Sequence, residues 1–134
     1  MIDFTQVVTA EDKLENAAKA KFKAIQAGQV KAKAGGIVVN GILFDSDLSA
    51  RMAYNELALR FSQNPTFSTR WKASTGSWVT MDAVLFSQVM AAGEAHIQGC
   101  FAWQEEREQE AAAALAAKDL EALEAVSEVF SPTI

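Results

Sequence analysis

The apolar positions of the chain change their spacing along its length, from helical intervals to short runs and back again. Intervals of three and four predict amphipathic helices, and short β-branched or aromatic runs beside turn residues predict strands. We therefore expect an α+β fold in which two β-hairpins form a small antiparallel sheet packed on helices. An N-terminal helical arm comes before the hairpins, and a long helix and a short terminal helix come after them.

The first helix is predicted from Thr9 to about Ala27, with Asp12 completing a capping box at its start. Its apolar stripe is narrow and lies on a rod rich in lysine and alanine. A stripe this thin favours an arm that packs on a partner or on a symmetry mate. Residues 28–36 end in two glycines and are expected to form a hinge or a short linker. The stripe consists of Leu14, Ala17, Ala18, Phe22 and Ile25.

A turn glycine is followed twice by a helix-capping residue four positions later and by an aspartate six positions later. The two copies are Gly41–Asp47 and Gly76–Asp82. Each predicts the return strand of a hairpin that leads directly into a helix. In the first copy either Asp45 or Ser46 is expected to cap the helix, and in the second copy Thr80.

The helix after the first hairpin is expected over about residues 47–63, because the residue before Pro65 is disfavoured in a helix. The second hairpin is expected to pair residues 68–72 with residues 77–79. The apolar residues of this helix are assigned broadly to one side of it. They are Leu48, Met52, Tyr54, Leu57, Leu59 and Phe61.

A long helix is predicted from about Met81, ending at a break near Lys118. At the standard rise it is roughly 50 Å long, more than a small sheet can cover. Its distal half is therefore expected to fold back on the last helix or to bundle with other chains. We divide the chain into an arm, residues 1–34, and a domain, residues 35–134. Two ridges form the apolar face: Leu85, Val89, Ala92, His96, Cys100 and Trp103, and beside them Phe86, Met90, Gly93, Ile97 and Phe101.

Composition limits the possible classes of function. A chain of 134 residues is the length of one domain, and its net charge of −5 argues against nonspecific nucleic-acid binding. No apolar run is long enough for a membrane span, and the start lacks a secretion signal, so cytoplasmic synthesis is expected. Residues 1–80 carry ten basic against seven acidic residues, and residues 81–134 carry two against ten. This asymmetry is read either as two solvated helix faces or as head-to-tail complementarity within or between protomers.

Reactive chemistry has little support in the residues. His96 and Cys100 are spaced as two metal ligands on one helix face, but the chain has no second cysteine or histidine. The single cysteine also excludes an internal disulfide. Aspartates 45, 47 and 82 are explained as helix caps rather than as paired catalytic carboxylates. We therefore expect no catalytic residue, no metal and no cofactor, and classify the protein as a non-enzyme.

Trp71 and Trp78 are expected to face each other across the second hairpin. They form either part of the sheet core or an exposed aromatic platform for a protein or glycan partner. Trp103 is predicted to be either a plug at the domain edge or an interface anchor. The candidate partner-binding residues are Leu14, Phe22, Ile25, Trp71, Trp78 and Trp103.

The segment Gly36–Asp47 resembles the opening of an uncharacterised domain family of tailed bacteriophages and prophages. The family continues with a helix, a tryptophan-containing hairpin that ends in a threonine cap, and a helix with an internal histidine and an aromatic residue. This resemblance covers about residues 36–128. The opening Ile2–Lys13 is also similar to segments of small proteins encoded beside phage tail-fibre genes. The matching residues after the opening are Trp71-Lys72, Trp78 to Asp82, His96 and Phe101.

The resemblance implies a tail-region protein that acts by protein–protein contact, either as a tail-fibre assembly factor or as a small tail or baseplate component of the virion. Its partner would be a tail-fibre or baseplate protein, and we expect a homo-oligomer. Its place would be the host cytoplasm during assembly or the virion tail. The family has no established catalytic residues to carry over. A module that binds host-surface glycans through the tryptophan pair is the alternative, and an enzyme ranks last.

Overall fold

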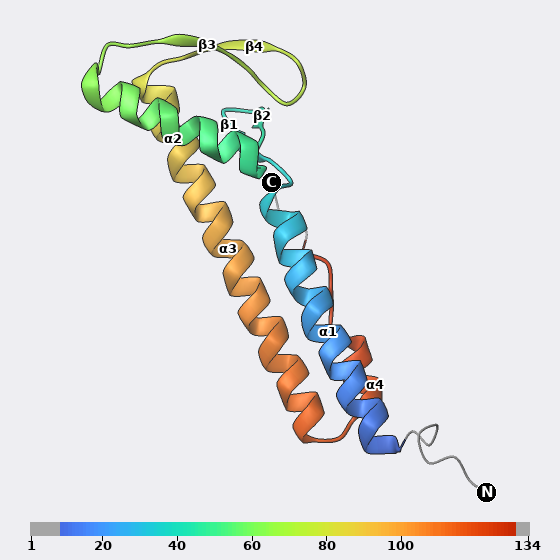
Figure 1. The fold of residues 1–134 in the computed structure, drawn as a ribbon. Coiled ribbons are helices and arrows are strands. Elements are labelled where there is room, and N and C mark those ends of the chain that lie inside the picture. Colours follow the sequence, from blue (N-terminus) through green and yellow to red (C-terminus); the bar gives the residue numbers. More distant parts are fainter. Residues whose placement is uncertain (1–8, 131–134) are drawn as a thin grey trace, which may run out of the picture. The chain divides into compact units, whose positions relative to one another are not determined.

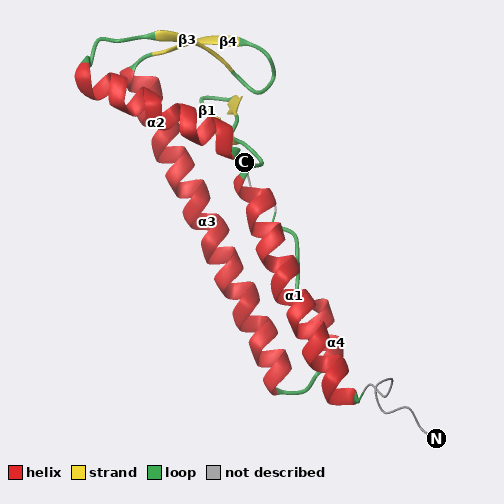
Figure 2. Cartoon of the chain, in the orientation of Figure 1, coloured by secondary structure: helices red, strands yellow, loops and turns green. Residues whose placement is uncertain are grey.

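The computed structural model describes residues 9–130 of the chain. Helices and two β-hairpins alternate along it, and the α+β class and the predicted order of elements are confirmed (Figures 1 and 2). The elements are α1 (Ala10–Lys33), β1 (Ile37–Val39), β2 (Ile42–Phe44), α2 (Leu48–Gln63), β3 (Thr69–Lys72), β4 (Trp78–Met81), α3 (Ala83–Ala116) and α4 (Leu120–Ala125).

The described residues fall into two compact units, each built from segments that are distant in the sequence. The helical unit combines the N-terminal residues up to Gln29 with Ala102–Phe130, and the hairpin unit consists of Val30–Phe101. This differs from the division into residues 1–34 and 35–134 that we predicted. The reason is that most of α1 packs with the second half of α3 and with α4, so it belongs to a folded unit.

The helical unit has its own apolar core. Side chains of α1, of the distal half of α3 and of α4 meet there, and the residues that follow α4 cover it. The narrow stripe of α1 is therefore buried inside the chain, although we had expected it to pack on a partner. The buried members of this core are Leu14, Ala18, Ile25, Trp103, Ala111, Ala114, Leu123 and Val126.

The ends of the helices in this unit follow the predicted capping chemistry. Thr9 and Asp12 bond reciprocally, backbone N–H to side-chain oxygen, at 3.2 and 3.0 Å, which confirms the capping box. The predicted break after α3 is also confirmed. Lys118 adopts a left-handed φ of 54°, and the carboxylate of Asp119 accepts a hydrogen bond from the N–H of Ala122 at 3.0 Å.

Helix α1 continues to Lys33 instead of ending near Ala27, so the predicted hinge over residues 28–36 is wrong for most of its length. Glycine lowers helix stability by roughly 1 kcal/mol, which is why Gly28 suggested an end. Burial outweighs this local preference, because Gln29 and Ala32 in the last turns are both buried.

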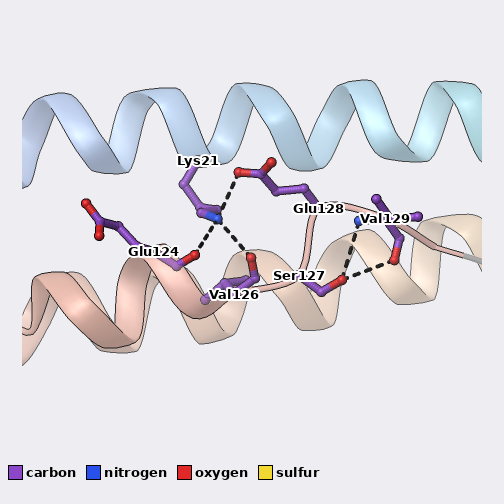
Figure 3. Close-up of polar contacts among 6 residues, drawn as sticks. All are labelled: Lys21, Glu124, Val126, Ser127, Glu128 and Val129. Carbon is purple, nitrogen blue, oxygen red and sulfur yellow. Dashed lines mark hydrogen bonds and ion pairs between the residues drawn. The ribbon is translucent and has the colours of Figure 1, made fainter.

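Lys21 on α1 is buried, and its side chain caps the C-terminal end of α4 (Figure 3). Its ammonium group donates hydrogen bonds to the carbonyls of Glu124 at 3.0 Å and Val126 at 2.8 Å. It also forms an ion pair with Glu128 at 2.8 Å. A helix ends with unsatisfied carbonyls, and a cation placed there bonds them and interacts favourably with the helix dipole.

The residues after α4, 126–130, form what we call the C-terminal strap of the helical unit. At its end the ring of Phe130 stacks on Trp103 with centroids 5.6 Å apart. In its middle the carbonyl oxygen of Glu128 lies so close to Gly28 that a Cβ there would overlap it. Glycine is therefore required at position 28 by the close approach of the strap.

The hairpin unit contains two separate two-stranded antiparallel sheets, whereas we predicted one small sheet. The first hairpin turns at Asn40 and Gly41, whose φ angles of 53° and 76° confirm the type I′ turn. A backbone hydrogen bond, from the N–H of Ser74 to the carbonyl of Leu43 at 3.0 Å, connects the turn of the second hairpin to β2, and the hydroxyl of Ser74 donates to the carboxylate of Asp45.

The helix caps in this unit lie one or two residues later than predicted. Asp47 caps α2 and accepts a hydrogen bond from Ala50 at 2.8 Å. Ser46 is instead buried and donates to the carbonyl of Lys33. Thr80 lies within β4, and the carboxylate of Asp82 takes the capping role for α3. The carboxylates are preferred because each reaches a free N–H of the first turn.

Helix α2 has two apolar faces, so the prediction that its apolar residues share one side is wrong. Tyr54, Leu57 and Phe61 are buried in the core of the hairpin unit, where Phe61 also stacks on Phe86 of α3. The other apolar residues are exposed to solvent. Their exposed fractions are 65% for Leu48, 60% for Met52 and 61% for Leu59.

Candidate functional site

A groove of about 480 Å³ lies between α2 and α3 in the hairpin unit. Each helix lines it with residues at positions i, i+3, i+4 and i+7, the spacing that places side chains on one helix face. The groove therefore has two walls, one from each helix, and each wall combines apolar and polar residues. The wall from α2 consists of Leu48, Arg51, Met52 and Asn55, and the wall from α3 consists of Met90, Gly93, Glu94 and Ile97.

The walls of the groove expose large apolar side chains. Leu48 and Met52 are each at least 60% exposed, and Met90 is 37% exposed. Isolated apolar residues on a surface need no explanation, but a group of them around a hollow is typical of a protein-binding site. Two of the three are methionines, whose flexible thioethers adapt to the shape of a partner.

The floor of the groove is rigid, because it belongs to the core of the hairpin unit. Ile37, Tyr54 and Val89 line it and are all buried. Gly93 contributes no side chain to the α3 wall. A Cβ at this position would have room, because the nearest atom is the Cδ1 of Ile37, at 3.7 Å. A partner helix can therefore approach the backbone of α3 closely at this point.

His96 lines the groove and Cys100 lies one helical turn further along α3. The imidazole of His96 is hydrogen-bonded, and the thiol of Cys100 is buried. The Nε2 of His96 is 2.8 Å from the carbonyl oxygen of Ala32, and because a carbonyl only accepts, this nitrogen donates. Cys100 is fully buried, and burial raises the pKa of its thiol, partly offset by Lys33. Among residues 9–130 no three histidine, cysteine or acidic side chains are grouped to hold a metal.

The two tryptophans of the second hairpin do not face each other, so that prediction is wrong. Trp71 pairs with Val79, and Trp78 pairs with Lys72, which places the indoles on opposite faces because successive strand residues alternate. Trp71 is half-buried and stacks on Tyr54 with centroids 5.5 Å apart, whereas Trp78 is 58% exposed.

A second cleft of about 390 Å³ lies beside Trp78, and Asp45, Asp47, Arg70 and Lys72 contribute to its lining. Tyr54 lies at its inner side. Burial, and then the carboxylates of Asp45 and Asp47, raises the pKa of Tyr54 to about 12. The phenol therefore stays protonated at neutral pH and donates to the carbonyl of Asp45 at 2.7 Å.

Four of the six predicted partner-binding residues come together, but in the core of the helical unit and not on its surface. Leu14, Ile25 and Trp103 are buried in the helical unit, and Phe22 is half-buried there. Trp71 is half-buried and packs against the core of the hairpin unit. Of the six residues, Trp78 is the one that is largely exposed.

The groove was not predicted, although α2 carries a signal for it. Leu48, Met52 and Leu59 are separated by four and seven residues, and Tyr54, Leu57 and Phe61 by three and four. Two apolar stripes on one short helix indicate that one of them faces away from the core. Which stripe is buried depends on tertiary packing.

These features define a small α+β protein with a built-in apolar groove and no helix, among the described residues, that is long and apolar enough to cross a bilayer. The family described as "Domain of unknown function (DUF4376)" matches residues 14–127, and the chain belongs to this family. The match includes parts of both units, so α1 is part of the family's domain. No curated protein and no solved structure gives a significant match.

Proposed function

We propose that this chain is a non-enzymatic bacteriophage tail-region protein that acts by protein–protein contact, either as a tail-fibre assembly factor or as a small tail or baseplate component. The observation that carries the contact function is the groove, with Leu48 and Met52 exposed on one wall and Met90 on the other. The resemblance of residues 36–128 to proteins of tailed phages supports the tail context.

The geometry of the groove supports protein binding over catalysis. Its walls present apolar side chains at helical spacing, which matches the way an amphipathic helix places its anchors in a groove. The polar groups nearest its floor already have partners within the unit, His96 with Ala32 and Tyr54 with Asp45. The exposed apolar side chains of the two walls are therefore the part of the groove that a partner can contact.

Replacing Leu48 with glutamate is expected to weaken partner binding about thirtyfold, the cost of a hot-spot residue. In a phage that encodes this chain, we expect a fall in infectious particles, measured by titre, with the protein still folded by circular dichroism. Leu59→Glu is the matched control, because Leu59 is also exposed on α2 but does not line the groove. Normal assembly with Leu48→Glu would contradict the proposal.

Mass spectrometry of purified particles separates the two forms of the proposed function. A tail or baseplate component is present in the particle at a defined copy number. An assembly factor is released before the particle is complete and is found only in the lysate. Electron microscopy of Leu48→Glu particles then shows whether fibres are missing or the tail is incomplete.

A second candidate function, a module that binds host-surface glycans, is favoured by the exposed indole of Trp78 beside polar side chains in the second cleft. An indole stacks on the apolar face of a sugar, and carboxylates accept hydrogen bonds from the hydroxyl groups of the sugar. Trp78→Ala is expected to abolish adsorption to host cells while changing the melting temperature by less than about 2 °C, and Trp78→Phe to retain part of it. Unchanged adsorption by Trp78→Ala eliminates this function.

A further inference from the structure

Two opposite charges lie in the middle of the groove's two walls. Arg51 is the i+3 residue of the α2 wall, and Glu94 is the i+4 residue of the α3 wall. The helices meet at Phe61 and Phe86, whose rings are 5.0 Å apart. Arg51 is ten residues before this contact and Glu94 eight residues after it, about 15 and 12 Å along their helices at the standard rise. The two charges therefore lie at a similar level of the groove.

Neither charge is neutralised within the described part of the chain. The ion pairs found among residues 9–130 do not include Arg51 or Glu94. The guanidinium of Arg51 makes one long contact, 3.4 Å from its Nε to the carbonyl of Asp47. Each wall of the groove thus combines exposed apolar side chains with a charge available to a partner.

We infer that the walls of the groove contact a second copy of this chain, related by a two-fold axis parallel to the groove. Such an axis places the α2 wall of each copy on the α3 wall of the other. Arg51 of each copy then meets Glu94 of its partner, so the dimer contains this ion pair twice. Leu48 and Met52 of one copy, about 20 and 14 Å from the helix contact, then lie at the level of Ile97 of the other copy, about 17 Å from it.

The charges of the two units favour the hairpin unit as the contact between copies. Val30–Phe101 contains six basic and five acidic residues, so two hairpin units repel each other little. The helical unit contains six basic against twelve acidic residues, a net charge of −6. Two helical units would repel each other on approach, and like charges strongly disfavour a contact.

Reversing one charge at a time tests this pairing. We expect the purified wild-type protein to be a dimer by sedimentation velocity, and Arg51→Glu and Glu94→Arg each to weaken self-association on the order of a hundredfold. Each single variant places like charges together twice. Combining both changes in one chain restores the dimer, because the pair is then reversed.

Mixing the two single variants is the decisive measurement. Arg51→Glu carries two acidic groups at these positions and Glu94→Arg two basic groups, so together they form a mixed dimer with both pairs restored. Misfolded variants would not rescue each other, and circular dichroism checks the fold of each. A monomeric wild type overturns the inference, as do single variants that still dimerise or a mixture that stays monomeric.

This inference rests on the proposed function only in taking the groove as a contact surface. It is tested on the purified protein, and the proposed function is tested in particles, so the two can fail separately. If the wild type is monomeric and Leu48→Glu still blocks assembly, the groove binds a different protein and the second copy is eliminated. If the dimer is found and Leu48→Glu leaves assembly normal, the dimer stands and the proposed function falls.

Discussion

Replacing Trp103 with alanine is expected to lower the free energy of unfolding by about 3–5 kcal/mol, the usual cost of removing a buried tryptophan. Trp103 is only 7% exposed and stacks on Phe130. A Cβ on Gly28 would lie 3.1 Å from its ring, so the indole also fills the space beside α1. Its loss opens a cavity and removes the surface on which the strap ends. Urea titration followed by circular dichroism measures the change.

Trp78→Ala is the matched control for this prediction. It makes the same chemical change at an indole that is 58% exposed, and we expect a loss below about 1 kcal/mol. If Trp103→Ala unfolded at the same urea concentration as the wild type, the indole would not be a core residue. It would then return as an interface anchor, which is one of the two roles predicted from the sequence.

Replacing Lys21 with methionine is expected to cost about 2–4 kcal/mol, because it leaves the carbonyls of Glu124 and Val126 without their charged donor. Methionine keeps the apolar stem of the side chain, so the change isolates the ammonium group. The ion pair with Glu128 contributes less, since the side chain of Glu128 is 48% exposed and solvent screens it. We also expect faster proteolysis within the strap.

Two controls separate these contributions. Lys23→Met removes an exposed lysine two residues away on α1 and is expected to change stability by less than about 0.5 kcal/mol. Glu128→Gln removes only the ion pair and is expected to cost less than about 1 kcal/mol. Equal effects of Lys21→Met and Lys23→Met would show that the carbonyls of α4 do not depend on Lys21.

The elements of the fold were largely predictable because their signals are local. Asn40-Gly41 dictates a type I′ turn wherever the flanking strands permit one, and Thr9 and Asp12 form a capping box from four consecutive residues. The caps of α2 and α3 were predicted only one or two residues too early, because capping signals are local as well. Asp45, Ser46 and Asp47 are all good caps, and only the path of the backbone selects Asp47.

The candidate site was much less predictable, because it depends on which apolar residues remain exposed. Leu48 and Met52 have the same hydrophobic character as Leu57, yet only Leu57 is covered. Trp103 and Trp78 also differ only in their surroundings. Burial of this kind arises from contacts between distant segments, which no local pattern contains.

The sequence by itself determined the α+β class, the order of the elements, both hairpins and the break between α3 and α4, since turn, cap and periodicity signals act over a few residues. Tertiary structure alone decided that α1 folds back into a unit with residues 102–130 and that its stripe is buried. It also decided that one face of α2 lines an open groove. The physical reason is that burial is a property of pairs of segments, and it can override the local preference of either one.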